Sequence, residues 1–156
     1  MKPLIEARAD DELSFSAEVS VIAAKQALEK AGLKPSDIDC VIVSAANLQR
    51  AYPAVAIEVQ NELGIEGFAY DMMVGCSAST FGISNAYADI KAEKSSKILV
   101  ISPEITSGHN NFKNRDGHFI FGDVCTAVVI EKASKAENKF KTVSYTHLTL
   151  PTKQMV

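Results

Sequence analysis

The chain has no tryptophan and only three cysteines among its 156 residues, and no apolar run approaches the length needed to cross a membrane. Its polar N-terminus does not resemble a secretory signal peptide. Cys40, Cys76 and Cys125 are odd in number and show no C-x-x-C spacing. This cysteine usage and the lack of an export signal fit a reducing compartment, so we expect a cytoplasmic protein. Without a long apolar run we expect no contact with a membrane, and we also expect no metal site and no cofactor.

Positive charge is not concentrated anywhere in the chain. The net charge is −3, and no block of basic residues is present, which argues against nucleic acid as a partner. The hydrophobic content of 47% and the charged content of 22% are ordinary for a soluble globular protein. A chain of this length is expected to form one domain with a sizeable core.

What the sequence does contain is an alternation of helical and strand-like segments. Apolar residues at helical spacing predict helices at about 14–31, 53–64 and 77–94. The buried residues of the third helix are expected to be Ile83, Ala86, Tyr87 and Ile90. Apolar runs predict strands at 40–44, 68–74, 97–102 and 124–131, with a polar loop at about 103–117. This order predicts a layered α/β fold with a mainly parallel sheet.

Cys76 is the most informative residue, because it lies between the predicted strand 68–74 and the predicted helix 77–94. At such a turn the backbone N–H groups and the positive end of the helix dipole favour a thiolate. The small residues around Cys76 leave room for an acyl group, so the sequence predicts a nucleophile that carries one. On position alone a buried structural cysteine remains the alternative. Cys40 and Cys125 fall in predicted strands and are interpreted as core residues.

Four short motifs extend the interpretation of Cys76. They are Tyr52–Ala54, Asp71–Ala78, Asn114–Gly117 and Phe121–Asp123. With these motifs, residues 10–132 resemble the N-terminal half of β-ketoacyl-acyl carrier protein synthase III, a member of the thiolase superfamily. Residues 75–82 and 103–109 are similar to the branch that uses medium-chain acyl primers. The resemblance implies a truncated thiolase-like fold and a homodimer.

The resemblance also implies an acyltransferase of fatty acid synthesis. In that family a cysteine takes an acyl group from acyl-CoA and condenses it with malonyl-acyl carrier protein, which loses carbon dioxide, to give 3-oxoacyl-acyl carrier protein. Cys76 matches this nucleophile, and its own backbone N–H would help to stabilise the oxyanion. Asp123 is expected to be structural, holding the turn that supports the floor of the active site.

Two further residues are assigned to substrate binding by the resemblance. Arg115 matches an arginine that contacts the adenine end of CoA. Tyr52 matches an aromatic residue that reaches across the dimer interface toward the acyl pocket of the partner. From the residues alone, a solvated loop arginine and ordinary packing of the tyrosine remain alternatives.

The chain departs from the family in its histidines and in its length. The family carries a His and an Asn in a second half, where they stabilise charge during decarboxylation, and this chain stops before that half. His109, His118 and His147 do not match the catalytic position and are expected to be loop or surface residues. The N-terminal strand at the centre of the family sheet is also missing, as is an aromatic residue that stacks on adenine.

We therefore expect an internal fragment. Residues 1–10 are expected to be irregular, residues 11–135 to form the incomplete thiolase-like half, and residues 136–156 to be a tail that resembles translated sequencing-adapter DNA. Without the central strand, strands 40–44 and 97–102 would lose the neighbour between them. Each unpaired buried backbone group costs about 1–3 kcal/mol, so we expect the isolated chain to be marginally stable.

Two other functions stay open at this point. Another member of the superfamily, such as a thiolase, a hydroxymethylglutaryl-CoA synthase or a simple acyltransferase, would share the cysteine. A truncated partner subunit without turnover is the alternative from another class. A homodimer interface resembles a core cut in half, so for a dimeric protein we expect an exposed apolar patch around Tyr52, Phe81 and Phe112.

Overall fold

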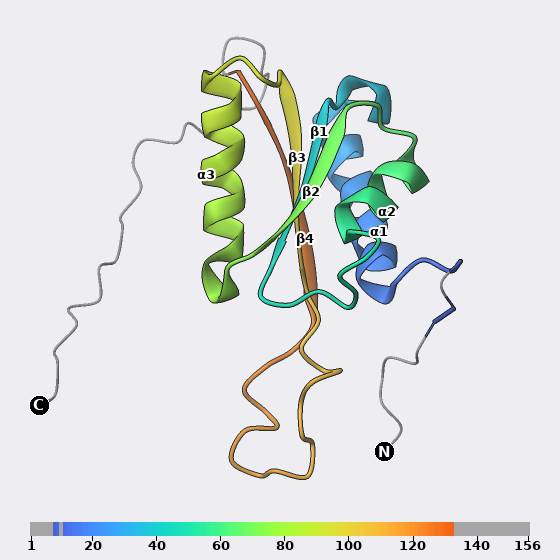
Figure 1. Ribbon diagram of the computed structural model, residues 1–156. Helices are drawn as coiled ribbons and strands as arrows, with labels where there is room; N and C mark the ends of the chain where they lie inside the picture. Colours follow the sequence, from blue (N-terminus) through green and yellow to red (C-terminus); the bar gives the residue numbers. More distant parts are fainter. Residues whose placement is uncertain (1–7, 10, 133–156) are drawn as a thin grey trace, which may run out of the picture.

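A four-stranded mixed sheet in the order β2-β1-β3-β4 forms the centre of the molecule (Figure 1). The structure is a computed structural model that describes residues 8, 9 and 11–132. Strand β1 pairs in parallel with both β2 and β3, and β4 runs antiparallel to β3. The elements in chain order are α1 Phe15–Ala31, a 3-10 helix Pro35–Asp37, β1 Cys40–Ala45, α2 Val55–Leu63, β2 Phe68–Met73, a 3-10 helix Gly75–Ser77, α3 Ala78–Lys91, β3 Lys97–Glu104 and β4 Val124–Glu131.

This architecture confirms the predicted layered α/β fold with a mainly parallel sheet. Most of the predicted irregular N-terminus, the tail 136–156 and His147 lie outside the described residues. No helix in the described part of the chain is long and apolar enough to cross a membrane.

Helix α1 begins and ends where the sequence predicts. The Ser14 side chain accepts a hydrogen bond from the Ala17 N–H at 3.2 Å, which caps the N-terminus. Gly32 follows the helix in the left-handed conformation, with φ of 66°. Glu58 of α2 accepts hydrogen bonds from both the N–H and the hydroxyl of Ser14, at 2.8 and 2.7 Å. The N-terminus of α1 is therefore tied to the neighbouring helix as well as to its own cap.

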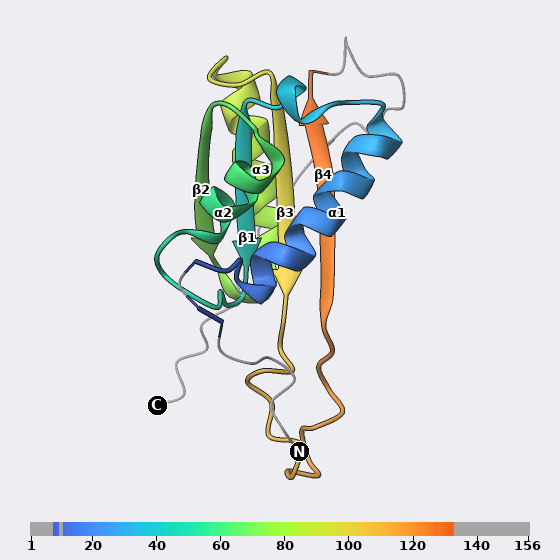
Figure 2. The ribbon, with the colours of Figure 1, turned by 90° about the vertical axis from the view of Figure 1, so that its right-hand side faces the viewer.

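The helices cover both faces of the sheet (Figures 1 and 2). Helices α1 and α2 lie on one face, with α1 crossing β3 and β4, and α3 lies on the other face. Alternate residues of a strand point to opposite faces, so Val41 and Leu99 pack under α1 and α2 whereas Ile42 and Val100 pack under α3. Strand β1 is buried along its whole length, as expected for a parallel strand covered on both faces.

The expectation that β1 and β3 lack a neighbour is wrong. The two strands pair directly in parallel, in a register that runs from Cys40 opposite Ile98 to Val43 opposite Ile101. Their backbone groups therefore hydrogen-bond to each other. Unpaired backbone groups between β1 and β3 therefore do not destabilise the chain.

The expected buried face of α3 is partly wrong. Tyr87 is 40% exposed, whereas Ala78, Gly82, Ala86 and Ile90 form the buried stripe. These residues are spaced by four and three of them are small, so the helix lies close to the sheet and leaves no space beneath it for a tyrosine. Helix α3 also ends at Lys91, earlier than residue 94, and Glu93 beyond it has a positive φ of 59°.

Two further boundaries differ from the predicted ones. Helix α2 begins at Val55, two residues after Pro53. Strand β3 continues beyond residue 102 to Glu104, because Pro103 and Glu104 still pair with Cys125 and Val124 of β4. The loop between β3 and β4 therefore comprises residues 105–123.

The start of α2 is capped from a neighbouring strand. Its N-cap residue Ala54 offers no side-chain hydrogen bond, and Asp71 of β2 accepts the N–H groups of Val55 and Ala56 at 2.8 Å each. Burial raises the pKa of Asp71, the two N–H groups oppose this increase, and the nearby Glu58 adds to it. Asp71 thus joins β2 to the end of the loop that follows β1.

The tight packing of α3 predicts a cost for any side chain at Gly82. A Cβ atom added there would lie 2.8 Å from Val100 Cγ1 and 3.1 Å from Ser44 Cβ. We expect Gly82→Val to lower the free energy of unfolding by about 1–3 kcal/mol, because the core must shift to admit the side chain. Urea unfolding followed by circular dichroism measures this change. Gly117→Val is the matched control, since an added Cβ there meets no atom within 4 Å; equal losses in both variants would contradict the packing.

The raised pKa of Asp71 predicts a pH dependence of stability. The folded chain binds this proton more tightly than the unfolded chain does. The stabilisation by the proton is therefore complete below the unfolded pKa and is lost as the pH rises through the folded pKa. We expect the unfolding free energy of the unsubstituted chain, minus that of Asp71→Asn, to fall as the pH rises above the ordinary aspartate pKa of 3.8. Urea titrations at a series of pH values above this pKa test it, and a difference that rises with pH would mean that the N–H groups dominate.

Candidate active site

The three residues predicted for the site follow three consecutive parallel strands. Tyr52 lies in the loop after β1, Cys76 in the turn after β2 and Arg115 in the loop after β3. Parallel neighbours end at the same edge of a sheet, and Figure 1 shows all three connections at the lower edge. Ligands of open α/β sheets bind outside the carboxyl ends of the strands. The fold thus brings the three predicted residues to one edge of the sheet.

Cys76 occupies the middle of the 3-10 turn Gly75–Ser77, directly before α3. Gly75 has a φ of 58°, a conformation that residues with a side chain rarely adopt, and its carbonyl accepts the N–H of Ala78. Cys76 itself is exposed. The alternative of a buried structural cysteine is therefore wrong for this residue.

The other two cysteines differ from Cys76. Cys40 is buried in β1, and burial, with smaller contributions from Asp89 and Asp39, raises its pKa to about 12. Cys125 is half-buried in β4, and burial raises its pKa to about 11 against a hydrogen bond with Ser20. Both residues were expected in the core, and both thiols stay protonated at neutral pH.

The first turn of α3 is held against the sheet by hydroxyl groups. Ser44, fully buried in β1, donates a hydrogen bond to the carbonyl of Ala78 at 2.7 Å. Ser79 donates to the hydroxyl of Ser102 in β3 at 2.8 Å. The sequence interpretation missed these serines. The available signal was a serine inside each of two otherwise apolar covered strands, where a hydroxyl needs a hydrogen-bond partner.

The loop that carries Tyr52 is fixed at its start and in its middle. Both carboxylate oxygens of Glu104 accept the N–H of Ala46, at 2.9 and 3.2 Å. The guanidinium of Arg50 lies 3.7 Å from the buried carboxylate of Glu58. Tyr52 follows Arg50 in this loop, and its side chain is 91% exposed, so ordinary packing before α2 does not describe it.

The loop that carries Arg115 is closed at its neck by Asp123. This carboxylate accepts the N–H groups of Thr106 and Ser107 at 2.8 Å each, and also the Ser107 hydroxyl. Partial burial favours the protonated form of Asp123, but the hydrogen bonds from Ser107 and Thr106 outweigh it and lower the pKa. Asp123 therefore has the structural role that the sequence predicted for it at this turn. Arg115 is exposed and has no ion pair among the described residues.

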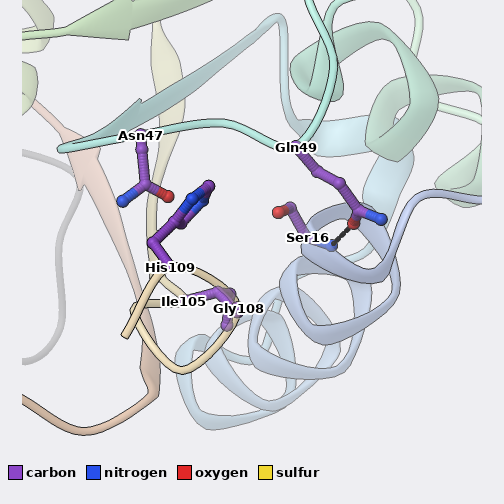
Figure 3. A pocket seen from close by; sticks show the side chains of 6 residues that line it. All are labelled: Ser16, Asn47, Gln49, Ile105, Gly108 and His109. Atoms are coloured by element: carbon purple, nitrogen blue, oxygen red, sulfur yellow. Dashed lines mark hydrogen bonds between the residues drawn. The ribbon is translucent and has the colours of Figure 1, made fainter. Parts of the chain in front are cut away.

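The loop between β3 and β4 also carries two histidines. His118 is half-buried, and its Nδ1 lies 3.0 Å from the Asn114 carbonyl. His109 is exposed and lines a cavity of about 160 Å³ that Cys76 does not line (Figure 3). The lining residues are Ser16, Asn47, Gln49, Ile105, Gly108 and His109. Within residues 8, 9 and 11–132, no group of three or more His, Cys, Asp or Glu side chains could hold a metal ion.

Comparison with known proteins places the chain in a family. A family profile described as 3-oxoacyl-[acyl-carrier-protein (ACP)] synthase III matches residues 70–147, which is half of the chain. The chain is 52% identical over 139 residues to beta-ketodecanoyl-[acyl-carrier-protein] synthase of Pseudomonas aeruginosa, a match that covers 89% of this chain and 40% of that protein. It is 38% identical over 125 residues to beta-ketoacyl-[acyl-carrier-protein] synthase III of Brucella anthropi, covering 80% and 38%. The chain spans about 40% of the length of these relatives.

Solved structures of the same family have a similar fold. The chain matches 3-oxoacyl-[acyl-carrier-protein] synthase III from Aquifex aeolicus with a TM-score of 0.72 and 28% identity, over 83% of this chain and 41% of that one. The synthase III from Thermus thermophilus matches with a TM-score of 0.72 and 26% identity, over 82% and 39%. The fold is therefore thiolase-like and truncated relative to these structures. Together with the profile match, this shows that the chain belongs to the 3-oxoacyl-[acyl-carrier-protein] synthase III family.

Proposed function

We propose that this chain provides the acyl-accepting part of a condensing enzyme of fatty acid synthesis. The observation that carries the proposal is the position of Cys76, exposed in a fixed turn between β2 and α3 at the carboxyl edge of the sheet. The other two cysteines are wholly or partly buried and have raised pKa values. Membership of the family supports the role of acyl acceptor for this exposed thiol.

The proposed first step is acyl transfer to Cys76. Its sulfur attacks the thioester carbonyl of an acyl-CoA, a new carbon–sulfur bond forms, and CoA leaves as its thiol. The N–H of Cys76 would donate to the oxyanion as the carbonyl carbon becomes tetrahedral. In the whole family enzyme the acyl-cysteine would then react with malonyl-acyl carrier protein, which loses carbon dioxide, to give 3-oxoacyl-acyl carrier protein. Because the His and Asn that stabilise charge in this step belong to the second half of the family, we propose that this chain alone is acylated at Cys76 but does not condense.

The preferred acyl group is proposed from the most similar of the relatives described above. Its name, beta-ketodecanoyl-[acyl-carrier-protein] synthase, denotes a ten-carbon product. Condensation with a malonyl group adds two carbons, so the primer that leads to this product has eight. We therefore propose octanoyl-CoA as the substrate class for Cys76.

Substrate binding is assigned to the two neighbouring loops. Arg115 is proposed to contact the adenine end of CoA, which its exposure in the loop 105–123 permits. Tyr52 is proposed to reach the acyl pocket of a partner subunit, and its 91% exposure leaves it available for such a contact. Phe81 and Phe112 are 43% and 39% exposed, as expected if a homodimer covers them. Acyl carrier protein is the proposed second partner.

Selective acylation of Cys76 is the first test. After incubation with octanoyl-CoA, mass spectrometry of peptides is expected to place the octanoyl group on Cys76 and on neither other cysteine. Cys125, with a pKa of about 11, holds a thiolate fraction of only about one in a thousand at pH 8. Cys76→Ala is expected to abolish the label. An octanoyl group on Cys40 or Cys125 in preference to Cys76 would overturn the assignment.

The role of Arg115 is tested by comparing two acyl donors. Arg115→Ala is expected to raise the octanoyl-CoA concentration for half-maximal labelling roughly fivefold, since one exposed charged contact contributes about 1 kcal/mol. Octanoyl-N-acetylcysteamine has no nucleotide, so its labelling rate should not change. Lys113→Ala on the same loop is the control for a general loss of positive charge. Equal losses with both donors would show that Arg115 acts on the fold of the loop and not on CoA.

A further inference from the structure

The serines beneath α3 form a group that the motif around Cys76 does not include. Ser44 is fully buried in a strand whose other residues are apolar or small. A buried hydroxyl is unfavourable unless it has a partner, and the Ser44 hydroxyl finds one in the Ala78 carbonyl at 2.7 Å. An alanine at this position would fill nearly the same space without that requirement. The hydroxyl therefore fixes a relation between β1 and the first residue of α3.

A second hydroxyl contact joins the same helical turn to the next strand. Ser79 donates to Ser102 at 2.8 Å, and Ser102 is buried in β3. The strands β1 and β3 are direct neighbours. The first turn of α3 is thus attached to two adjacent strands by two consecutive residues, which opposes rotation of the helix about its axis as well as sliding along it.

Gly82 makes both contacts possible. It lies one turn further along α3, where any Cβ atom would collide with Val100 and approach Ser44. The missing side chain lets the backbone of α3 lie close enough for a side chain as short as serine to reach it. The serine contacts and the glycine therefore act as one arrangement.

We propose that Ser44 and Ser102 are positioning residues that orient Cys76 for acyl transfer. The inference rests on the proposed function. Neither serine need touch the substrate, because Ser44 acts through Ala78 and Ser102 acts through Ser79, two and three residues after Cys76. Attack on a thioester requires a defined approach of the sulfur and a defined direction of the N–H that meets the oxyanion. A small rotation of the first turn of α3 would disturb both.

The first experiment compares two reactions of the same thiol. Ser44→Ala is expected to slow octanoyl transfer from octanoyl-CoA to Cys76 roughly fivefold, the effect of one typical hydrogen bond. Alkylation of Cys76 by iodoacetamide has no comparable orientation requirement, so its rate should not change. Ser20→Ala is the matched control, because the Ser20 hydroxyl is also buried and donates to a backbone carbonyl, that of Ser16, but lies in α1 on the opposite face of the sheet. Its acylation rate should match that of the unsubstituted chain.

The second experiment uses the other hydroxyl pair, where Ser79 is exposed and its substitution is least disruptive to folding. Ser79→Ala and Ser102→Ala should each slow octanoyl transfer, and the double variant should be no slower than either single variant, because both remove one contact. Ser79→Thr keeps the hydroxyl and should restore the rate. These variants remain informative if Ser44→Ala does not fold.

The outcomes separate the inference from the proposed function. If the unsubstituted chain is alkylated at Cys76 but never acylated, the proposed function fails and the inference fails with it. If it is acylated and the serine variants react at its rate, only the inference is overturned. Parallel losses in acylation and alkylation, or a similar loss in Ser20→Ala, would also overturn it, because they would show a purely structural role. Slower acylation with unchanged alkylation, reversed by Ser79→Thr, supports it.

Discussion

The close packing of α3 on β1 and β3 is the constraint on which the candidate site depends. Both strands are hydrogen-bonded to each other and buried on both faces, so they form a rigid floor. Gly82 allows the helix to approach this floor, and Ser44 fixes its first turn. The turn that holds Cys76 is the direct continuation of this helix. The position of the thiol is thus set by a buried part of the molecule, although Cys76 itself is exposed.

The neighbouring loops depend on the same sheet through carboxylate groups. Glu104 at the end of β3 holds the start of the loop after β1, and Asp71 in β2 holds its end by capping α2. Asp123 closes the neck of the loop after β3. In each case a carboxylate accepts backbone N–H groups, the kind of hydrogen bond that charge strengthens. The exposed side chains of Tyr52 and Arg115 therefore project from loops whose ends are fixed.

Local signals in the sequence were sufficient to predict the helices and strands and the turn that holds the nucleophile. Ser14 and Gly32 delimit α1 as capping residues usually do. Cys76 could be identified because a strand-like segment ends just before it and a helical one begins just after it. The resemblance to the family, carried by four short motifs, gave the chemistry that the local pattern alone left open.

The features that escaped prediction depend on contacts between distant residues. Periodicity marked Tyr87 as buried because it cannot register how close the helix lies to the sheet, which Gly82 decides. The direct pairing of β1 with β3 could not be predicted from the segments themselves, since any two apolar strands satisfy the same pattern. Ser44 and Ala78 are 34 residues apart, and a serine within an apolar strand does not reveal which carbonyl it will meet.

The most direct test of whether the packing of α3 presets Cys76 is a crystal structure of the chain after reaction with octanoyl-CoA. The account predicts electron density for an octanoyl thioester on Sγ of Cys76, between the loops that follow β1 and β3. It also predicts that the hydrogen bonds from Ser44 to Ala78 and from Ser79 to Ser102 are retained. An acyl group on another residue, or a first turn of α3 that has moved away from these serines to accommodate it, would contradict the claim that the packing of α3 presets the nucleophile.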